Sequence, residues 1–161
     1  MALPEFLAHA VAGWAGFYAD HRIVSVTVRY LHLAGLLIGG GTALALDRRV
    51  LGARRRPEPE RRAVLDALAG SHRVVLPAFG LVMLTGVLMT ASDTATFFAA
   101  RIYWTKMSLV ALLLLNGAGL LLAEGRARRN GRWTWVSVAS ALSLALWLSI
   151  LYAGVWLTVS A

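Results

Sequence analysis

Long apolar runs alternate with short charged segments along this chain. The four longest runs occupy residues 23–46, 74–92, 102–123 and 134–160. A bilayer core about 30 Å thick requires roughly 20 mostly apolar residues in a helix, and each run meets that length. The pattern predicts an all-α protein in which residues 1–161 form a single membrane domain, a bundle of four transmembrane helices.

Two shorter helical patterns lie outside these runs. In residues 1–21, apolar side chains recur at helical spacing while Glu5, His9 and Asp20 fall between them, which predicts an amphipathic helix on the outer membrane surface. A signal peptide is the alternative, but Glu5 stands where such a peptide carries basic residues, so we expect the segment to be retained. In the Arg-rich loop 47–73, residues 60–69 predict a short helix that ends at Gly70 and lies along the inner surface.

The positive charges predict the orientation of the bundle. Eight arginines fall in the connection 47–73 and four in the connection 124–133, so twelve of the sixteen Lys and Arg residues lie on one side. Loops rich in Lys and Arg stay in the cytoplasm. The sequence therefore predicts that both connections are cytoplasmic and that both termini lie outside (N-out, C-out).

Composition narrows the classes of protein. Hydrophobic residues make up 58% of the chain, and the formal net charge is +8. Most of this basicity follows from orientation and attraction to anionic headgroups, so we expect a lipid bilayer and no nucleic acid as partner. The sequence has no cysteine, which excludes disulfides, thiolate zinc sites and iron–sulfur clusters. It also lacks phosphate-binding and metalloprotease motifs, so we expect no autonomous catalytic activity.

Small residues form a stripe along the fourth apolar run. Side chains of this size let membrane helices approach closely. The stripe occupies every fourth position and consists of Ser137, Ala141, Ala145, Ser149 and Ala153. It predicts close helix packing, either inside this bundle or against another subunit.

Ionisable residues inside the apolar runs are the candidate functional residues, because charge in the membrane interior is costly. Arg29 and His32 lie in the first run and Lys106 in the third. At about 1.5 Å per residue, His32 lies about 13 Å from the outer end of its helix, at the depth of Met83, and Lys106 about 7 Å from its own. We expect a pocket in the outer half of the bundle, formed by Arg29, His32, Gly35, Gly39, Met83 and Lys106.

The residue types in this pocket admit several ligands. Haem b needs an axial histidine, glycines beside the macrocycle and cations for its propionates, and Met83 could serve as a second ligand to the iron. Copper would use His32 and Met83. A quinone or an anionic lipid would need only Arg29 and Lys106. In the simplest alternative, both cations extend to the surface and His32 makes one interhelical hydrogen bond.

Other polar residues are expected to have structural roles. Asp47 is predicted to pair with neighbouring arginines, and Glu124 with Arg128, at helix ends on the surface. Asn116 in the third run is predicted to make an interhelical hydrogen bond.

Several short motifs occur along the chain in a recognisable order. They are Tyr30-Leu31-His32-Leu33-Ala34-Gly35, then residues 46–52, then Thr85-Gly86-Val87-Leu88, then Tyr103-Trp104-Thr105-Lys106 with Leu115-Asn116. Over residues 3–125 this order resembles an uncharacterised family of small bacterial four-helix membrane proteins. That family is distantly similar to the membrane domain of CopD copper-resistance proteins and to cytochrome b561-like bundles.

This resemblance implies a bacterial inner membrane and chemistry involving electrons or metals. The chain also departs from the family pattern, because relatives often carry a histidine soon after the asparagine of the third span. Here Asn116 is followed by Gly-Ala-Gly-Leu. That departure weakens the expectation of a haem held by histidines from two helices.

Three functional hypotheses follow. The first is a small inner-membrane subunit that transfers electrons or binds haem b or copper around His32. The second is a structural or assembly subunit of a larger membrane complex, or a homo-oligomer, without a cofactor. The third is a component that transports anions or small solutes by means of Arg29 and Lys106.

Overall fold

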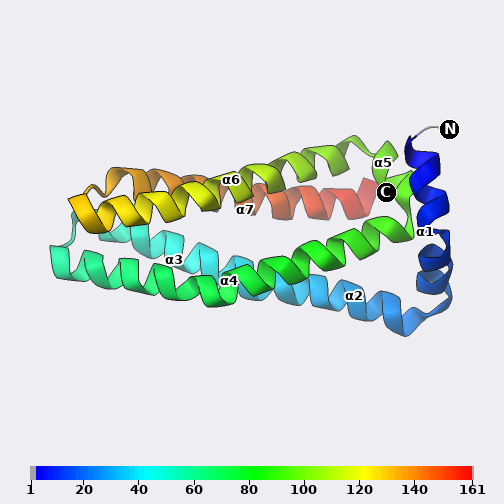
Figure 1. Cartoon of the computed structure of the whole chain (residues 1–161), viewed down its shortest axis with the longest axis horizontal. Coiled ribbons are helices and arrows are strands. Elements are labelled where there is room, and N and C mark those ends of the chain that lie inside the picture. Colours follow the sequence, from blue (N-terminus) through cyan, green and yellow to red (C-terminus); the bar gives the residue numbers. More distant parts are fainter. Residues whose placement is uncertain (1–2, 161) are drawn as a thin grey trace.

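The computed structural model describes residues 3–160, which are almost entirely helical (Figure 1). The elements in chain order are α1 (Leu3–Asp20), α2 (Arg22–Gly35), η1 (Leu36–Gly40), α3 (Gly41–Gly52), η2 (Ala53–Arg55), α4 (Glu58–Ser92), α5 (Thr94–Ala99), α6 (Arg101–Asn130) and α7 (Thr134–Ser160). No strand occurs within residues 3–160, so the predicted all-α class is confirmed. The terminal residues 1, 2 and 161 of the predicted domain lie outside the described residues.

Four helical segments are long and apolar enough to cross a membrane, as predicted. They cover Arg22–Arg55, Glu58–Ser92, Arg101–Asn130 and Thr134–Val159. Large apolar side chains such as Leu37, Leu115 and Val155 are exposed along them. An exposed apolar surface of this extent is expected where helices face lipid instead of water.

Both Arg-rich turns lie at the same end of the bundle. The turn at residues 53–57 joins the first two spans and the turn at residues 131–133 joins the last two (Figure 1). We call this end the arginine-rich end. The two ends of the chain lie at the opposite end, beside α1, which we call the α1 end.

The first span changes its helical geometry midway. η1 is a π-helical turn between α2 and α3, and it contains Gly39 and Gly40, the first two of three consecutive glycines. A Cβ added at Gly39 would lie 2.8 Å from Cβ of Ala78 in α4, and one added at Gly40 would lie 3.2 Å from the Trp147 ring of α7. A π turn holds more residues than an α turn and so rotates the faces that follow it. Accordingly α2 packs on α4, whereas α3 also packs on α7.

The second span is one continuous helix, which corrects the sequence prediction. A separate surface helix over residues 60–69 was expected, but α4 runs without a break from Glu58 to Ser92. Gly70 sits inside it with nothing within 4 Å of its Cβ position. Leu65 and Leu68 are buried against the other spans, so packing holds this segment upright in the bundle.

The main core lies at the arginine-rich end, where all four spans meet. It consists of Leu46, Val50 and Ala53 from the first span and its 3-10 turn η2, Leu65 and Leu68 from α4, Leu120, Ala123 and Ala127 from α6, and Trp133 and Val136 at the start of α7. The Trp133 indole nitrogen donates a hydrogen bond to the Val50 carbonyl over 3.1 Å. A second apolar cluster around Leu113, Leu146 and Trp147 joins α6 and α7 nearer the α1 end.

Two helices cover the α1 end. α1 lies across the ends of the spans (Figure 1), and Trp14 donates a hydrogen bond to the Leu88 carbonyl of α4 over 2.8 Å. The predicted helix near residues 1–21 is therefore present as Leu3–Asp20, although the side chains of residues 3–8 and 10 lie outside the description. α5 was not predicted, and its start is capped by Asp93, whose side chain accepts a hydrogen bond from the Thr96 amide.

The small-residue stripe of α7 faces mostly outward. Ser137 and Ala153 are buried, whereas Ala141, Ala145 and Ser149 between them are exposed. A step of four residues advances about 40° beyond a full turn, so the stripe winds away from the buried face of the helix. Packing inside this chain uses a different face of α7, formed by Val136, Ser140, Ser143, Trp147 and Ile150.

Candidate functional site

His32 is held in the interface between α2 and α4. Its Nδ1 lies 2.9 Å from the Thr85 hydroxyl oxygen, which in turn donates its only proton toward the Leu81 carbonyl at 2.7 Å. With the Thr85 proton directed at Leu81, the hydroxyl oxygen accepts from His32 Nδ1–H, and in this tautomer Nε2 is the unprotonated nitrogen of the ring. The interhelical hydrogen bond expected for His32 is present.

The glycines beside His32 serve helix packing. A Cβ at Gly35 would lie 2.8 Å from the Val82 side chain, and one at Gly39 would lie equally close to Ala78. Gly86 of α4 faces the edge of the imidazole, since its Cβ position lies 3.5 Å from His32 Cε1. α4 therefore occupies the face that a macrocycle would need.

Lys106 of α6 lies near His32 from the other helix pair. Its side chain is half-buried and passes Gly154 of α7, whose Cβ position lies 3.6 Å from Nζ. The ammonium is within electrostatic range of His32. Among residues 3–160, no carboxylate forms an ion pair with Lys106. Two of the predicted site residues, Lys106 of α6 and His32 of α2, thus lie within electrostatic range of one another.

Arg29 and Met83 do not join this pair. Met83 is 37% exposed and lies off the face of α4 formed by Ala78, Val82 and Thr85, which packs on α2. Arg29 is exposed as well, and it makes no ion pair with any residue in the described range. The predicted six-residue pocket is therefore not assembled as expected.

The residues present do not fit haem b or a copper ion at His32. The glycine face is filled by α4, and Met83, the predicted second ligand, is exposed and is not among the α4 residues that contact these glycines. His21 stacks on Phe17 in α1, and His72 lies near the arginine-rich end. Within the described residues, no three His, Cys, Asp or Glu side chains converge as metal ligands.

Asp47 is buried, which corrects its predicted place in a surface pair. The side chain is 2% exposed and faces Ser140 and Ser143 of α7. The sequence carried a signal for this, because Ala43, Asp47 and Val50 follow the spacing of one helix face. The neighbouring arginines suggested surface ion pairs for Asp47. The carboxylate is buried because α7 packs over it.

A charged network joins α4 and α6 at the arginine-rich end. Arg128 pairs with Glu124 at 3.0 Å and with Asp66 at 2.6 Å, and His72 Nε2 lies 3.5 Å from Glu124. The predicted pairing of Glu124 with Arg128 is confirmed, but Glu124 is buried and not at the surface. This network links α4 to α6 at the arginine-rich end of both helices.

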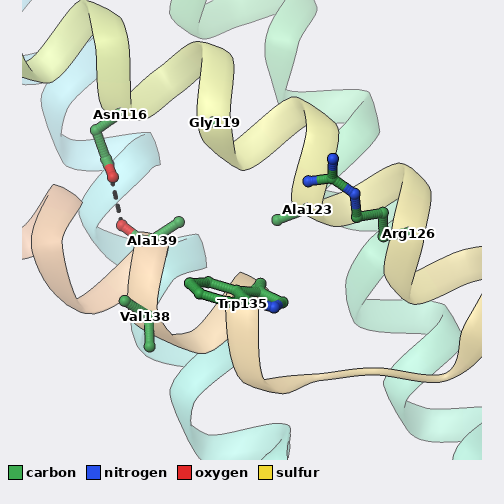
Figure 2. A pocket seen from close by; sticks show the side chains of 7 residues that line it. All are labelled: Asn116, Gly119, Ala123, Arg126, Trp135, Val138 and Ala139. Carbon is green, nitrogen blue, oxygen red and sulfur yellow. Dashed lines mark hydrogen bonds between the residues drawn. The ribbon is translucent and has the colours of Figure 1, made fainter.

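A shallow groove runs between α6 and α7 (Figure 2). Asn116 donates a hydrogen bond to the Ala139 carbonyl over 3.0 Å at one end, so its predicted interhelical bond is confirmed. Gly119 and Ala123 form the small-residue floor, while Arg126 and Trp135 flank the other end. The volume is about 260 Å³, which is modest for a ligand site.

Comparison of this chain with protein-family models, with curated proteins and with solved structures finds no match in any of the three. The similarity to copper-resistance membrane domains and cytochrome b561-like bundles therefore remains an expectation from the sequence motifs.

Proposed function

We propose that this protein is a small multi-pass membrane subunit that binds the head of a quinone beside Lys106 and His32. The observation that carries the proposal is a half-buried lysine with no carboxylate partner in residues 3–160, within electrostatic range of a histidine that Thr85 orients. A cation placed at membrane depth without a counter-ion marks a ligand or ion site.

The chemistry of the two side chains suits a quinone. Its carbonyl oxygens accept hydrogen bonds, and reduction places negative charge on them, which an ammonium stabilises strongly in a medium of low dielectric constant. His32 Nε2, left unprotonated by the bond to Thr85, can accept a proton from a reduced head group.

Depth distinguishes this ligand from an anionic lipid. Lys106 follows the start of α6 at Arg101 by five residues, about 7 Å along the helix axis. Lipid phosphates stay at the interface because burying a full charge is costly, whereas a neutral quinone head enters the apolar layer. With a quinone as its ligand, the role that we propose for the subunit is in electron transport, and the experiment below tests the ligand.

Binding can be measured by quenching of tryptophan fluorescence with a short-chain quinone in lipid nanodiscs. We expect saturable quenching, weakened about tenfold or more by Lys106→Met, which corresponds to about 1.4 kcal/mol. Thr85→Val should weaken binding less, because it only frees the imidazole. Arg29→Gln is the control, because it also removes one positive charge from a span but at an exposed position, and it should leave binding unchanged.

Two results would contradict the quinone assignment. One is quenching that does not saturate, or that Lys106→Met leaves unaltered. The other is displacement of the quinone by an anionic phospholipid at equal membrane fraction, which would identify the lipid as the natural ligand.

A structural role is the second candidate, favoured by the exposed middle of the small-residue stripe. Ala141, Ala145 and Ser149 present a smooth outer face on α7, which suits close contact with another transmembrane helix. If that face binds a second copy or a larger complex, Ala145→Leu should lower the assembled fraction in crosslinking. Leu148→Ala, also on an exposed position, is the control.

A further inference from the structure

A second polar site lies near the arginine-rich end, between α3 and α7. Asp47 is almost completely buried there, as are the nearby apolar residues Leu46 and Val50 of the same helix. The adjacent Arg48 and Arg49 are exposed, and no described cation forms an ion pair with the carboxylate. A buried carboxylate without a partner must be compensated, because isolated charge is strongly disfavoured in an apolar environment.

Two serine hydroxyls of α7 face this carboxylate. Ser140 and Ser143, three residues apart on one helix face, both face Asp47, and Ser140 is fully buried. Asp47 Oδ2 and Ser140 Oγ nevertheless lack a hydrogen-bond partner, as does the buried hydroxyl of Ser137 one turn earlier. The Asp47 and Ser140 oxygens are thus withdrawn from water and left unsatisfied beside one another, with a third unsatisfied hydroxyl one turn away on α7, which is unusual in native proteins.

The donor set points to a hard cation of single charge. Carboxylate and hydroxyl oxygens suit alkali and alkaline-earth ions, and no histidine, methionine or cysteine is among them. One carboxylate supplies one negative charge, so a monovalent ion makes the site neutral, whereas a divalent ion would leave excess charge buried.

We propose that Asp47, with the hydroxyls of Ser137, Ser140 and Ser143, forms a binding site for a monovalent alkali cation between α3 and α7. The ion satisfies Oδ2 and the unpaired hydroxyls together, and it ties α7 to the first span. This site lies on different residues from the Lys106 and His32 pair, so the two proposals can fail independently.

Sodium is the probe for this site. Thermal unfolding of the full chain in detergent is measured while choline chloride is replaced by NaCl at constant total chloride. We expect a saturable rise of about 5 °C or more once Na⁺ exceeds its dissociation constant about a hundredfold. Equilibrium dialysis with radioactive sodium should give one bound ion per chain.

Substitutions identify the ligands. Asp47→Asn should abolish the Na⁺-dependent rise and make the protein at least as stable in choline as the unsubstituted chain, since no charge then needs compensation. Ser140→Ala should move the titration midpoint to higher Na⁺. Asp66→Asn, which removes an exposed carboxylate at the same end, should keep the full response.

Three outcomes would overturn the cation site. Stability that follows pH but not Na⁺ would show that a proton neutralises Asp47. Insensitivity to both would indicate that buried water satisfies the oxygens. An unchanged Na⁺ response in Ser140→Ala and Ser143→Ala, which remove little volume and should still fold, would place any bound ion elsewhere.

Discussion

At the scale of the residue, small side chains determine how closely the membrane helices approach one another. Gly35 and Gly39 bring α2 and η1 against α4, and this contact in turn places His32 within hydrogen-bond distance of Thr85. The same pattern was consistent with a haem cradle, because glycine permits either a helix or a flat ligand to come close. The glycines predict that some group comes close to the backbone. Whether that group is a helix or a ligand depends on the packing of the whole bundle.

Gly39→Ala tests this reading. The new methyl group would lie 2.8 Å from Ala78 Cβ, so the helices must separate, and we expect a loss of about 1–3 kcal/mol of stability. Gly41→Ala is the matched control, because nothing lies within 4 Å of its Cβ position and its backbone is helical. It should be neutral or stabilising by up to about 1 kcal/mol. Unfolding midpoints in detergent compare the two, and equal effects would contradict the packing role.

At the scale of the element, α4 shows that tertiary packing can override a local helix-end signal. The sequence predicts that a surface helix ends at Gly70, and a glycine that ends a helix commonly adopts a left-handed conformation. In the structure Gly70 lies within the helix, while Gly131, which does end a helix, has φ of +66°. Leu65 and Leu68 are buried in the core at the arginine-rich end, and this packing keeps residues before Gly70 in the same helix as the rest of the span.

Alanine at these two glycines should have opposite effects. Gly70→Ala should stabilise the protein by about 0.4–1 kcal/mol, since the backbone is helical and the Cβ position is free. Gly131→Ala should destabilise it by about 1 kcal/mol or more, because a left-handed backbone disfavours a side chain. A destabilising Gly70→Ala, measured by thermal unfolding, would mean that α4 breaks there.

At the scale of the whole molecule, the two ends of the bundle differ in their positive charge. Both Arg-rich turns lie at one end, and both chain ends lie at the other (Figure 1). This arrangement is the one expected for the N-out, C-out orientation that the sequence predicts, since arginine-rich connections are retained in the cytoplasm. The two candidate sites then lie at different depths, with Lys106 and His32 in the outer half and Asp47 near the inner surface.

The cysteine-free sequence makes this orientation easy to test. Ala95→Cys in α5 and Arg62→Cys in α4 each introduce a single exposed thiol at opposite ends. We expect a membrane-impermeant maleimide to label Ala95→Cys in intact cells and Arg62→Cys only after permeabilisation. The reverse labelling pattern would show that the orientation is the opposite one, with the Asp47 site nearer the outer surface.

The sequence by itself determined the four spans, because span length and apolar content are local properties that the bilayer thickness selects. It also determined that His32 needs a polar partner across a helix interface, since a lone imidazole in an apolar layer must be satisfied. Neither conclusion required knowledge of which helices are neighbours.

Only the tertiary structure decided which faces meet. Thr85 as the partner of His32, the burial of Asp47 under Ser140 and Ser143, and the outward position of Ala145 all depend on the rotation of each helix about its axis. In lipid, apolar residues surround every helix, so hydrophobic periodicity does not mark the inward face. The relative rotation is set by contacts between distant segments, at Gly39 with Ala78 and at Gly40 with Trp147, and these contacts exist only once the bundle is assembled.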